Sequence, residues 1–587
     1  MKRFSNRRFL SISTAVALVF LLSVTAVFAA WPSFQNTNAN NGVITVPTGG
    51  TAPPTATGTA ARPTTLPSTS AWLGVEVPPV IGADGYAYTL HNGGTQGALL
   101  EKTDLANPVT TATPYVVLNS AAQNVQQLST PYINGSTLYT LVATAPTIYT
   151  SSNFDGWKTD GGATVSGGTV TFPENDDEAG ITSEVGELYL ANAVTTLLVQ
   201  TDLNPTVATD SGDYSVTLTG PASVTLVPST NFTGEYGTYY TYEGTVPPGS
   251  YTVRLSVAKT TGTSTATYIT IGTYRWQLFS VNTTLAPGQT PTLITSGQGQ
   301  PNTPISYDGS GNIYWGVWGG DKSYFQLDVG SGSTTPLPFA PGGGDNFYWA
   351  GAAFVTIDNT DYVVFGSDSG TMYIRPVIGF GDVSPAPDPG FTKTIDQTLF
   401  PNDKIRSSVA VKGDYVYFTS TWAQSTPTAN YTGELWQVAV SSLTTSGTLS
   451  TGYVTLTNAS TSTPVISNNN YVYVGTYNGF TSGTVEAFPV SNFITGAKIP
   501  IYPASGTGDP VQSSPIAYTG APWDYVYFTT NASGGSGYCY RFNGTTVQSR
   551  WTAANTSGNN YSLQGMAYAD NGYVVWGDDG NNLYIAP

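Results

Sequence analysis

The chain has 587 residues, with 19 basic and 36 acidic side chains and a formal net charge of −17 at pH 7. A protein this acidic repels nucleic acid and anionic lipid. We therefore expect no nucleic-acid partner. One cysteine, Cys539, and one histidine, His91, exclude an intramolecular disulfide and a His/Cys zinc site.

Residues 1–29 have the pattern of a secretory signal peptide. Four basic residues precede a nearly apolar run, Ala15–Phe28, and Val27 and Ala29 occupy the −3 and −1 positions of a cleavage site. The apolar run is short for a membrane span, and no other stretch is long and apolar enough. The sequence therefore predicts a secreted protein, extracellular or at the cell surface or in a periplasm, with no integral membrane span after cleavage.

The mature chain opens with two segments of different composition. Residues 30–46 are expected to contain a strand. Residues 47–70 are rich in Thr and Pro, which is typical of an extended linker without a core.

A strand signal of alternating aromatic and β-branched residues then recurs along the chain. Consecutive repeats lie within four residues of 52 apart, except for one interval of 175. The repeats are anchored at Tyr86, Leu138, Ile313, Tyr362, Tyr415, Tyr471, Tyr525 and Tyr573. The sequence thus predicts eight units, the second of which carries an insertion of roughly 123 residues.

Each unit contains four short strand signals, which is the size of one propeller blade. We therefore expect an all-β fold, an eight-bladed β-propeller formed by residues 71–144 and 273–587. The eighth unit ends at Pro587 without a fourth strand. A segment near the N-terminus is expected to supply it, either Trp31–Ile44 or Ala71–Val77, so that the ring closes.

The insertion, residues 145–272, falls between the second and third strands of blade two. Eight strand signals between residues 169 and 271 predict a jelly-roll or Ig-like β-sandwich. Pro247–Leu255 and Asn153–Trp157 resemble segments of carbohydrate-binding and adhesive modules.

The repeats also resemble those of the quinoprotein-type (PQQ-like) β-propeller family. The resemblance lies in Trp31–Asn36 and in a third strand that ends in Leu327-Asp328 with Gly332 following. The vicinal cysteine pair and the tryptophan-docking repeat of quinone-binding members are absent, and related members serve as non-enzymatic assembly scaffolds. The resemblance therefore implies a propeller and leaves the function open.

Aromatic residues near strand ends and loops are candidates for stacking on a ligand, a sugar ring above all, although packing between blades would also explain them. These are Trp157, Trp315, Trp318, Trp349, Trp422 and Tyr477. An acidic run could bind Ca²⁺, although a solvated loop would look the same. Its carboxylates are Glu174, Asp176, Asp177 and Glu178.

No catalytic residue can be nominated from a motif, and no cofactor other than Ca²⁺ is expected. We therefore predict a non-catalytic binding or scaffold protein of the cell envelope or extracellular matrix. It would act through the propeller loops and the insertion, and bind a surface glycan, an envelope protein or further copies of itself. The alternative is a polysaccharide hydrolase or lyase with paired carboxylates on the propeller.

Overall fold

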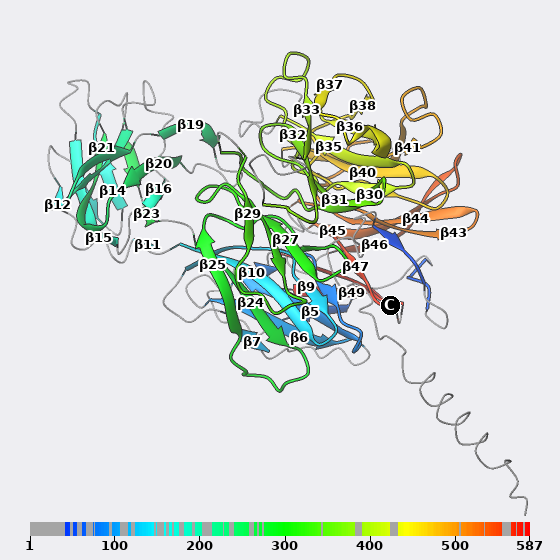
Figure 1. Ribbon diagram of the computed structural model, residues 1–587, viewed down its shortest axis with the longest axis horizontal. Helices are drawn as coiled ribbons and strands as arrows, with labels where there is room; N and C mark the ends of the chain where they lie inside the picture. The colour runs from blue at the N-terminus through cyan, green and yellow to red at the C-terminus, as the bar shows by residue number, and fades with distance from the viewer. Residues whose placement is uncertain are drawn as a thin grey trace, which may run out of the picture.

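Strands make up nearly all regular structure in the computed structural model of this protein (Figure 1). It describes residues 275–341, 344–381, 390–422, 432–479, 481–503, 506–532, 535–554, 565–570, 572–578 and 582–586. Between residues 42 and 272 it describes the strands and some of their connections. In this part of the chain, no helix is long and apolar enough to cross a membrane. One short 3₁₀ turn, η5, covers Val440–Ser442.

Outside residues 146–272, the described strands form eight small sheets in chain order, which we number 1 to 8. Sheet 1 contains β4 (Val80–Ile81), β5 (Tyr86–Asn92), β6 (Ala98–Asp104) and β7 (Val116–Val117), with β3 (Gly74–Val75) also on β5. Sheet 2 contains β9 (Tyr132–Asn134), β10 (Thr137–Ala145), β24 (Arg275–Asn282) and β25 (Thr292–Gln298), with β8 (Asn124–Leu128) also on β10. Sheet 3 contains β26 (Ser306–Tyr307), β27 (Asn312–Gly316), β28 (Tyr324–Asp328) and β29 (Leu337–Phe339).

The next three sheets repeat this antiparallel order. Sheet 4 contains β30 (Ala353–Ile357), β31 (Thr360–Phe365), β32 (Thr371–Pro376) and β33 (Phe391–Ile395), extended by β37 (Gly447–Leu449). Sheet 5 contains β34 (Ala410–Lys412), β35 (Tyr415–Ser420), β36 (Glu434–Ala439) and β38 (Tyr453–Thr455). Sheet 6 contains β39 (Val465–Ile466), β40 (Tyr471–Asn478), β41 (Ser482–Pro489) and β42 (Ile499–Tyr502).

The last two sheets take strands from both ends of the chain. Sheet 7 contains β43 (Ile516–Gly520), β44 (Trp523–Thr529), β45 (Ser536–Phe542) and β46 (Val547–Ala554), with β1 (Val43–Ile44) beside β43. Sheet 8 contains β47 (Ala567–Tyr568), β48 (Val574–Gly577), β49 (Asn582–Ala586) and β2 (Arg62–Thr65). Each predicted repeat anchor lies in the second strand of its sheet, except Tyr573, which directly precedes that strand. These segments form strands because alternating aromatic and β-branched residues suit strands that are buried on both faces.

Neighbouring sheets share apolar cores. Clusters of buried side chains join each sheet to the next, from sheets 1 and 2 through to sheets 6 and 7. One further cluster joins sheets 7, 8 and 1 through Trp551, Trp576 and Ile81, among others. The stacking of Trp551 on Trp576, with ring centroids 6.2 Å apart, is part of this contact. The eighth sheet therefore packs against both the seventh and the first.

Ser and Thr hydroxyls just before the first strands, or at the start of one, tie the sheets together. Each bonds to a backbone group of the neighbouring sheet. The bonds are Ser129 Oγ to Thr303 O, Ala352 N to Ser306 Oγ (2.9 Å), Gly351 N to Ser408 Oγ (2.9 Å), Ser408 N to Thr463 Oγ1 (3.0 Å) and Thr463 N to Ser514 Oγ (2.9 Å). They run without interruption from sheet 2 to sheet 7.

We call residues 42–65 the N-terminal strap; its described parts, residues 42–46, 51–55 and 62–65, lie against sheets 7 and 8. β1 pairs in parallel with β43, and β2 pairs antiparallel with the C-terminal strand β49. Between them, Pro54 O accepts bonds from Trp551 Nε1 (2.9 Å) and Tyr527 Oη (3.2 Å). The strand that completes sheet 8 is thus Arg62–Thr65, and neither expected candidate, Trp31–Ile44 or Ala71–Val77, takes that place. Arg62–Thr65 lies inside residues 47–70, which were expected to be a linker, so that expectation is wrong for these four residues. Their pairing with β49 is made by the backbone and therefore needs no apolar pattern in the sequence.

The insertion leaves sheet 2 after β10 and returns at β24, and these two strands pair directly from Thr137↔Asn282 to Thr144↔Arg275. Its described strands form three sheets, seen to one side of the others in Figure 1. The first contains β11 (Ile148–Tyr149), β23 (Ile269–Gly272), β16 (Val194–Thr201), β20 (Tyr240–Val246) and β19 (Pro228–Thr233). The second contains β12 (Lys158–Thr159), β15 (Ile181–Leu190), β21 (Gly249–Val257), β17 (Tyr214–Thr219) and β18 (Ser223–Leu226). The third contains β13 (Thr164–Ser166), β14 (Thr169–Phe172) and β22 (Ser264–Ala266).

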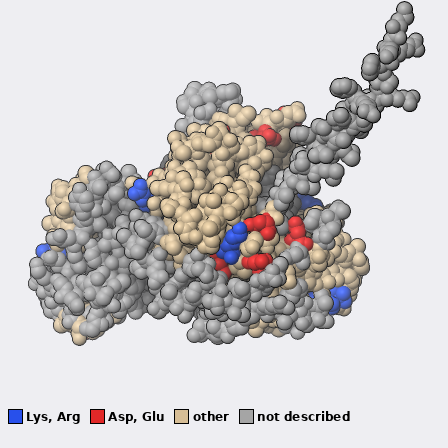
Figure 2. Space-filling view, turned by 90° about the horizontal axis from the view of Figure 1, so that it is seen from below, with Lys and Arg blue, Asp and Glu red and all other residues tan. Residues whose placement is uncertain are grey.

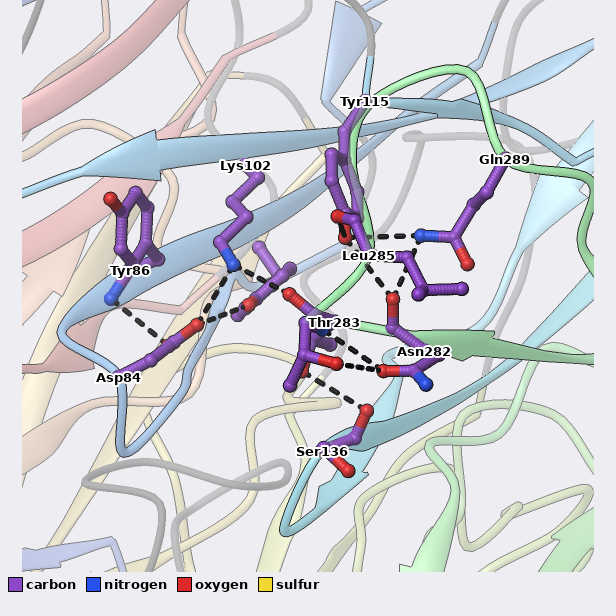
Figure 3. A network of polar contacts seen from close by, with 11 residues as sticks. Asp84, Tyr86, Lys102, Tyr115, Ser136, Asn282, Thr283, Leu285 and Gln289 are labelled. Atoms are coloured by element: carbon purple, nitrogen blue, oxygen red, sulfur yellow. Dashed lines mark hydrogen bonds and ion pairs between the residues drawn. The ribbon is translucent and has the colours of Figure 1, made fainter.

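A polar network around Lys102 joins sheets 1 and 2 (Figure 3). The Lys102 amine pairs with Asp84 (2.9 Å) and donates to Thr283 O (2.6 Å). Three tyrosine rings surround the same amine, with centroids 4.4 to 5.5 Å away: Tyr86, Tyr88 and Tyr115. One partly buried cation thus holds two sheets together through charge, hydrogen bonding and cation–π contact.

We expect Lys102→Met to lower the free energy of unfolding by about 1–2 kcal/mol, because Asp84 and the Thr283 carbonyl lose a donor while the side-chain volume is kept. Lys412→Met is the control. Lys412 donates to Asn468 Oδ1 at 2.9 Å in an exposed bond, so its removal should change stability by less than about 0.5 kcal/mol. Urea unfolding of both variants measures the difference, and equal effects would contradict a special role for Lys102.

Candidate loop-side binding site

The connections at one end of the sheets form a common loop side. Here each second strand turns into the third, and each fourth strand leads to the next first strand. Isolated bridges join the two kinds of connection in three sheets: Gln300↔Trp318, Lys404↔Thr421 and Ala459↔Tyr477. The insertion replaces the corresponding turn of sheet 2, so it stands on this same side.

A cluster of charged and aromatic residues occupies the loop side at sheets 4 and 5. We call Tyr348, Asp368, Lys404 and Arg406 the Asp368 cluster. Arg406 holds the Asp368 carboxylate with two bonds of 2.8 Å, and Lys404 Nζ lies 3.6 Å from the same group. The Arg406 guanidinium carbon lies 4.5 Å from the centre of the Tyr348 ring. Bidentate pairing together with ring stacking fixes the Arg406 side chain in one position.

The pKa values in the cluster follow from burial and charge. Burial acts to raise the pKa of Asp368, but Arg406 and Lys404 outweigh it and bring the pKa below the usual range. Burial lowers the pKa of Lys404, and Asp368 partly offsets this. Asp368 is therefore ionised at neutral pH and serves as the anchor of the two cations.

Trp349 extends the cluster to the surface. Its ring lies 4.6 Å from the Tyr348 ring, and its side chain is partly exposed. Its φ is 60°, a conformation that bulky residues rarely adopt. The Trp349 carbonyl accepts a 2.9 Å bond from Gly351 N, and the Ser408 hydroxyl lies 3.4 Å away. Backbone conformation and the Tyr348 ring thus place the indole before any ligand arrives, and strain of this kind concentrates at functional sites.

Sequence reasoning did not identify the polar neighbours of this cluster. Asp345 accepts bonds from Ser369 Oγ (2.5 Å) and Tyr373 Oη (3.0 Å). Asn346 joins the loops of sheets 3 and 4, because its side chain accepts from Gly319 N (2.8 Å) and its carbonyl from Asp368 N (2.9 Å). These residues follow no motif, so only their place at strand ends could have suggested them.

A second group beside the cluster is a buried carboxyl pair, Asp403 and Glu434. The Ser420 hydroxyl lies 2.7 Å from Asp403 Oδ2 and 3.3 Å from Glu434 Oε2, and it accepts a 2.9 Å bond from Trp436 Nε1. Burial and the neighbouring Asp403 raise the pKa of Glu434 to about 9, and burial also raises the pKa of Asp403. The pair therefore holds a proton at neutral pH. The available signal for Glu434 was an acidic residue at the start of a strand whose other residues, apart from Gln437, are apolar.

The structure separates the predicted aromatic residues into two groups. Trp315 is fully buried against Trp276 and Phe325, and Trp318 is 5% exposed, so neither offers a face to a ligand. Sheet 3 packs on both faces, which is why a strand tryptophan becomes core there. Trp349, Trp422 and Tyr477 are partly exposed on the loop side. Trp422 follows Thr421, the bridge partner of Lys404, whereas Tyr477 lies in the next sheet.

The remaining predicted residues lie mostly outside the described part of the chain. Trp157, Asp176, Asp177 and Glu178 are outside it, and Glu174 is exposed. Among the described residues, no group of three or more His, Cys, Asp or Glu side chains could hold a metal ion. His91 is buried, with Nε2 3.2 Å from Glu101 Oε2. Cys539 is buried, and burial raises the pKa of its thiol.

Figure 2 shows a face on which charged side chains are few and uncharged residues fill most of the described surface. This agrees with the 9% content of charged residues. Recognition on such a surface must rest on aromatic rings, hydroxyls and amides more than on long-range charge.

No protein-family model matches the chain, and no curated protein matches it. Among solved structures it is similar to BamB from Moraxella catarrhalis, with 13% identity and a TM-score of 0.34 over 54% of this chain and 80% of that one. It is similar to a chain of a mitotic checkpoint complex, with 14% identity and a TM-score of 0.33 over 54% and 86% of the two chains. A puromycin-hydrolyzing peptidase from Mycobacterium tuberculosis matches at 12% identity and a TM-score of 0.29, over 46% and 42%. Similarity at this level carries no conclusion about function.

Proposed function

We propose that this chain is a secreted, non-catalytic binding or scaffold protein of the cell envelope or extracellular matrix. In this proposal the eight sheets are the blades of one β-propeller, and residues 145–272 form a β-sandwich mounted on its loop side. The ligand is a surface glycan or an envelope protein. The packing of every sheet on its neighbours, sheet 8 on sheet 1 included, supports the propeller.

The observation that carries the binding role is the placement of Trp349. A partly exposed indole, set by a left-handed backbone and backed by Tyr348, is a preorganised stacking surface. Behind it, Asp368 pairs with both Arg406 and Lys404, so the site has a rigid base in which the buried charges already have partners. Such a site suits neutral sugar rings, whose apolar faces stack on aromatic side chains while their hydroxyls bond to nearby polar groups.

We expect Trp349→Ala to weaken binding of the mature protein to neutral cell-wall polysaccharide by at least about tenfold, since a central aromatic contact contributes on the order of 2 kcal/mol. Isothermal titration calorimetry with polysaccharide fractions measures the effect. Trp523→Ala is the matched control, because Trp523 is also a partly exposed tryptophan that packs on a neighbouring side chain (Arg541, 4.1 Å), but it lies at the opposite end of its strand from the loop side. Equal affinity of wild type and the Trp349 variant would reject this site.

The carboxyl pair is poorly suited to the alternative function, polysaccharide hydrolysis or elimination. Glycosidases hold their two carboxyl groups about 5–10 Å apart across an open site. Asp403 and Glu434 instead share one serine hydroxyl and are each 5% or less exposed. Calcium binding by the acidic run from Glu174 to Glu178 remains a prediction.

A further inference from the structure

Three unlike side chains occupy the same place in sheets 3, 4 and 5. Asn302, Trp349 and Arg406 each lie four residues before the first strand of their sheet, which is β26, β30 or β34 respectively. All three therefore belong to the connections of the loop side. Trp349 and Arg406 are already part of the candidate binding site, and Asn302 is their counterpart in the neighbouring sheet.

The three connections lie side by side. Two residues after each of these side chains stand Pro304, Gly351 and Ser408. A Cβ atom on Gly351 would lie only 2.6 Å from Ser408 Oγ and 3.4 Å from Pro304 Cδ, so the middle connection is in close contact with both of its neighbours. The connection that carries Asn302 thus packs directly against the one that carries Trp349.

The side-chain amide of Asn302 is buried without a partner. Asn302 is 5% exposed, and neither its Oδ1 nor its Nδ2 has a hydrogen-bond partner among the described residues. Buried amides nearly always have partners, because an unpaired donor or acceptor costs free energy. At the equivalent place in sheet 7, Gln512 does accept a bond, from the amide of Asn531. Beside a candidate binding site, an unpartnered amide is a place where a ligand can supply the missing partners.

We propose that the Asn302 amide binds two adjacent hydroxyl groups of the sugar ring that stacks on Trp349. Nδ2 donates to the oxygen of one hydroxyl, and Oδ1 accepts a hydrogen bond from the other. An uncharged amide suits a neutral sugar, and a few such polar groups orient a ligand that is held mainly by an aromatic surface. The assignment rests on the proposed binding function and adds a specificity to it, namely a sugar whose adjacent hydroxyls are free.

The ligand reaches Asn302 by a local adjustment, because the amide is buried in the free protein. In the part of the chain that the structure describes, no hydrogen bond holds the amide in place, so the side chain can change rotamer without breaking one. Trp349 does not need to move, since its backbone conformation and the Tyr348 ring already fix the indole.

Calorimetric titration of the full mature chain with neutral cell-wall polysaccharide tests the proposal through Asn302→Leu. Leucine has nearly the size of asparagine but neither polar atom, so we expect binding to weaken by at least about tenfold as two hydrogen bonds to the ligand are lost. The urea midpoint of this variant should stay at or above that of wild type, because the free protein loses no hydrogen bond.

Thr140→Val is the matched control. The Thr140 hydroxyl is also buried without a partner among the described residues. It lies within β10, on the same face as Leu138 and Val142, which pack against sheet 1. The variant should therefore bind the polysaccharide as wild type does.

The same polysaccharide after O-methylation tests the hydroxyl contacts themselves. Methylation keeps the rings and their lack of charge but removes the hydroxyl donors, so wild type should bind the methylated form more weakly. Asn302→Leu has already lost the amide contacts, so methylation should weaken its binding less than it weakens that of wild type.

Three results would overturn the proposal, and they can be told apart. If Asn302→Leu binds as wild type does while Trp349→Ala is impaired, the stacking site stands and Asn302 has no part in it. A clear fall in the urea midpoint of Asn302→Leu would show that the amide is hydrogen-bonded in the free protein. If wild type binds no neutral polysaccharide, the proposed function fails and the role of Asn302 falls with it.

Discussion

A chain that begins at Ala71, and so lacks the N-terminal strap, is expected to lose cooperative folding at 25 °C. The deletion exposes β43 and the C-terminal strand β49, which pair with β1 and β2. It also removes the buried side chains of Val43 and Ile44, each worth about 1.5–3 kcal/mol.

Several hydrogen bonds of the strap, each contributing about 1 kcal/mol, disappear with it. They include Thr51 N to Asp570 O (2.9 Å), Trp551 Nε1 to Pro54 O (2.9 Å) and Arg550 Nε to Thr55 O (2.9 Å). The summed loss is comparable with the whole stability of an ordinary domain, about 5–15 kcal/mol. Thermal unfolding followed by circular dichroism, with limited proteolysis, measures it.

Two controls isolate the strap from the loss of chain length. A chain that begins at Asn41 keeps every contact of the strap and should unfold as the mature protein does. A peptide of residues 42–65, added to the chain that begins at Ala71, should restore the transition in a concentration-dependent way. If the shortened chain unfolds at the same temperature as the mature protein, then pairing of the strap with sheets 7 and 8 does not contribute to the free energy of unfolding.

Raising the pH from 5 to 9 should destabilise the folded protein through Glu434. The pKa of Glu434 is raised from its usual value of 4.5 to about 9, so between these values the folded chain keeps a proton that the unfolded chain has released. The stabilisation is therefore complete below pH 4.5 and is lost as the pH rises towards 9, with a slope of up to about 1.4 kcal/mol per pH unit.

Glu434→Gln should flatten this slope, because the amide donates a hydrogen bond in place of the protonated carboxyl but does not titrate. Asp403→Asn should flatten it as well, and the double variant should add little, since the two groups share one proton. Urea unfolding at several pH values between 5 and 9 measures the slope. An unchanged slope in both single variants would show that the pair is not protonated.

Asp368→Asn distinguishes this effect from a general response to charge removal. The pKa of Asp368 is lowered, so its stabilisation is present at neutral pH and is lost as the pH falls. The variant should be less stable by about 3 kcal/mol near pH 7, because Arg406 loses its buried partner. It should nevertheless keep the slope between pH 5 and 9.

Much of the architecture follows from local sequence pattern. Alternating aromatic and β-branched residues predict the second strand of each sheet, and the break in their spacing places the insertion between β10 and β24, where the structure has it. Described strands overlap each strand signal of the insertion, and the last signal is divided between β22 and β23, which lie in different sheets. These features could be predicted because a buried strand needs the same kinds of side chain wherever it occurs.

The remaining features depend on tertiary contacts that leave no local pattern. Arg62–Thr65 looks like a linker, since its pairing with β49 is made by the backbone. Trp315 and Trp349 look alike in sequence, but one lies within a strand packed on both faces and the other in a loop. Asp368, Lys404 and Arg406 come from separate connections, and only the fold brings them together.

The direct pairing of β10 with β24 determines how the molecule would respond to a pulling force. The insertion is attached to these two strands, which are inner members of sheet 2, with β25 outside β24 and with β8 and β9 on the far side of β10. Tension applied to the inserted domain pulls both strands along their length and in the same direction. The hydrogen bonds to β25, β8 and β9 are then loaded in shear and all at once, while the bonds between β10 and β24 bear no load. Such an attachment resists rupture better than a terminal strand that can be peeled away one bond at a time.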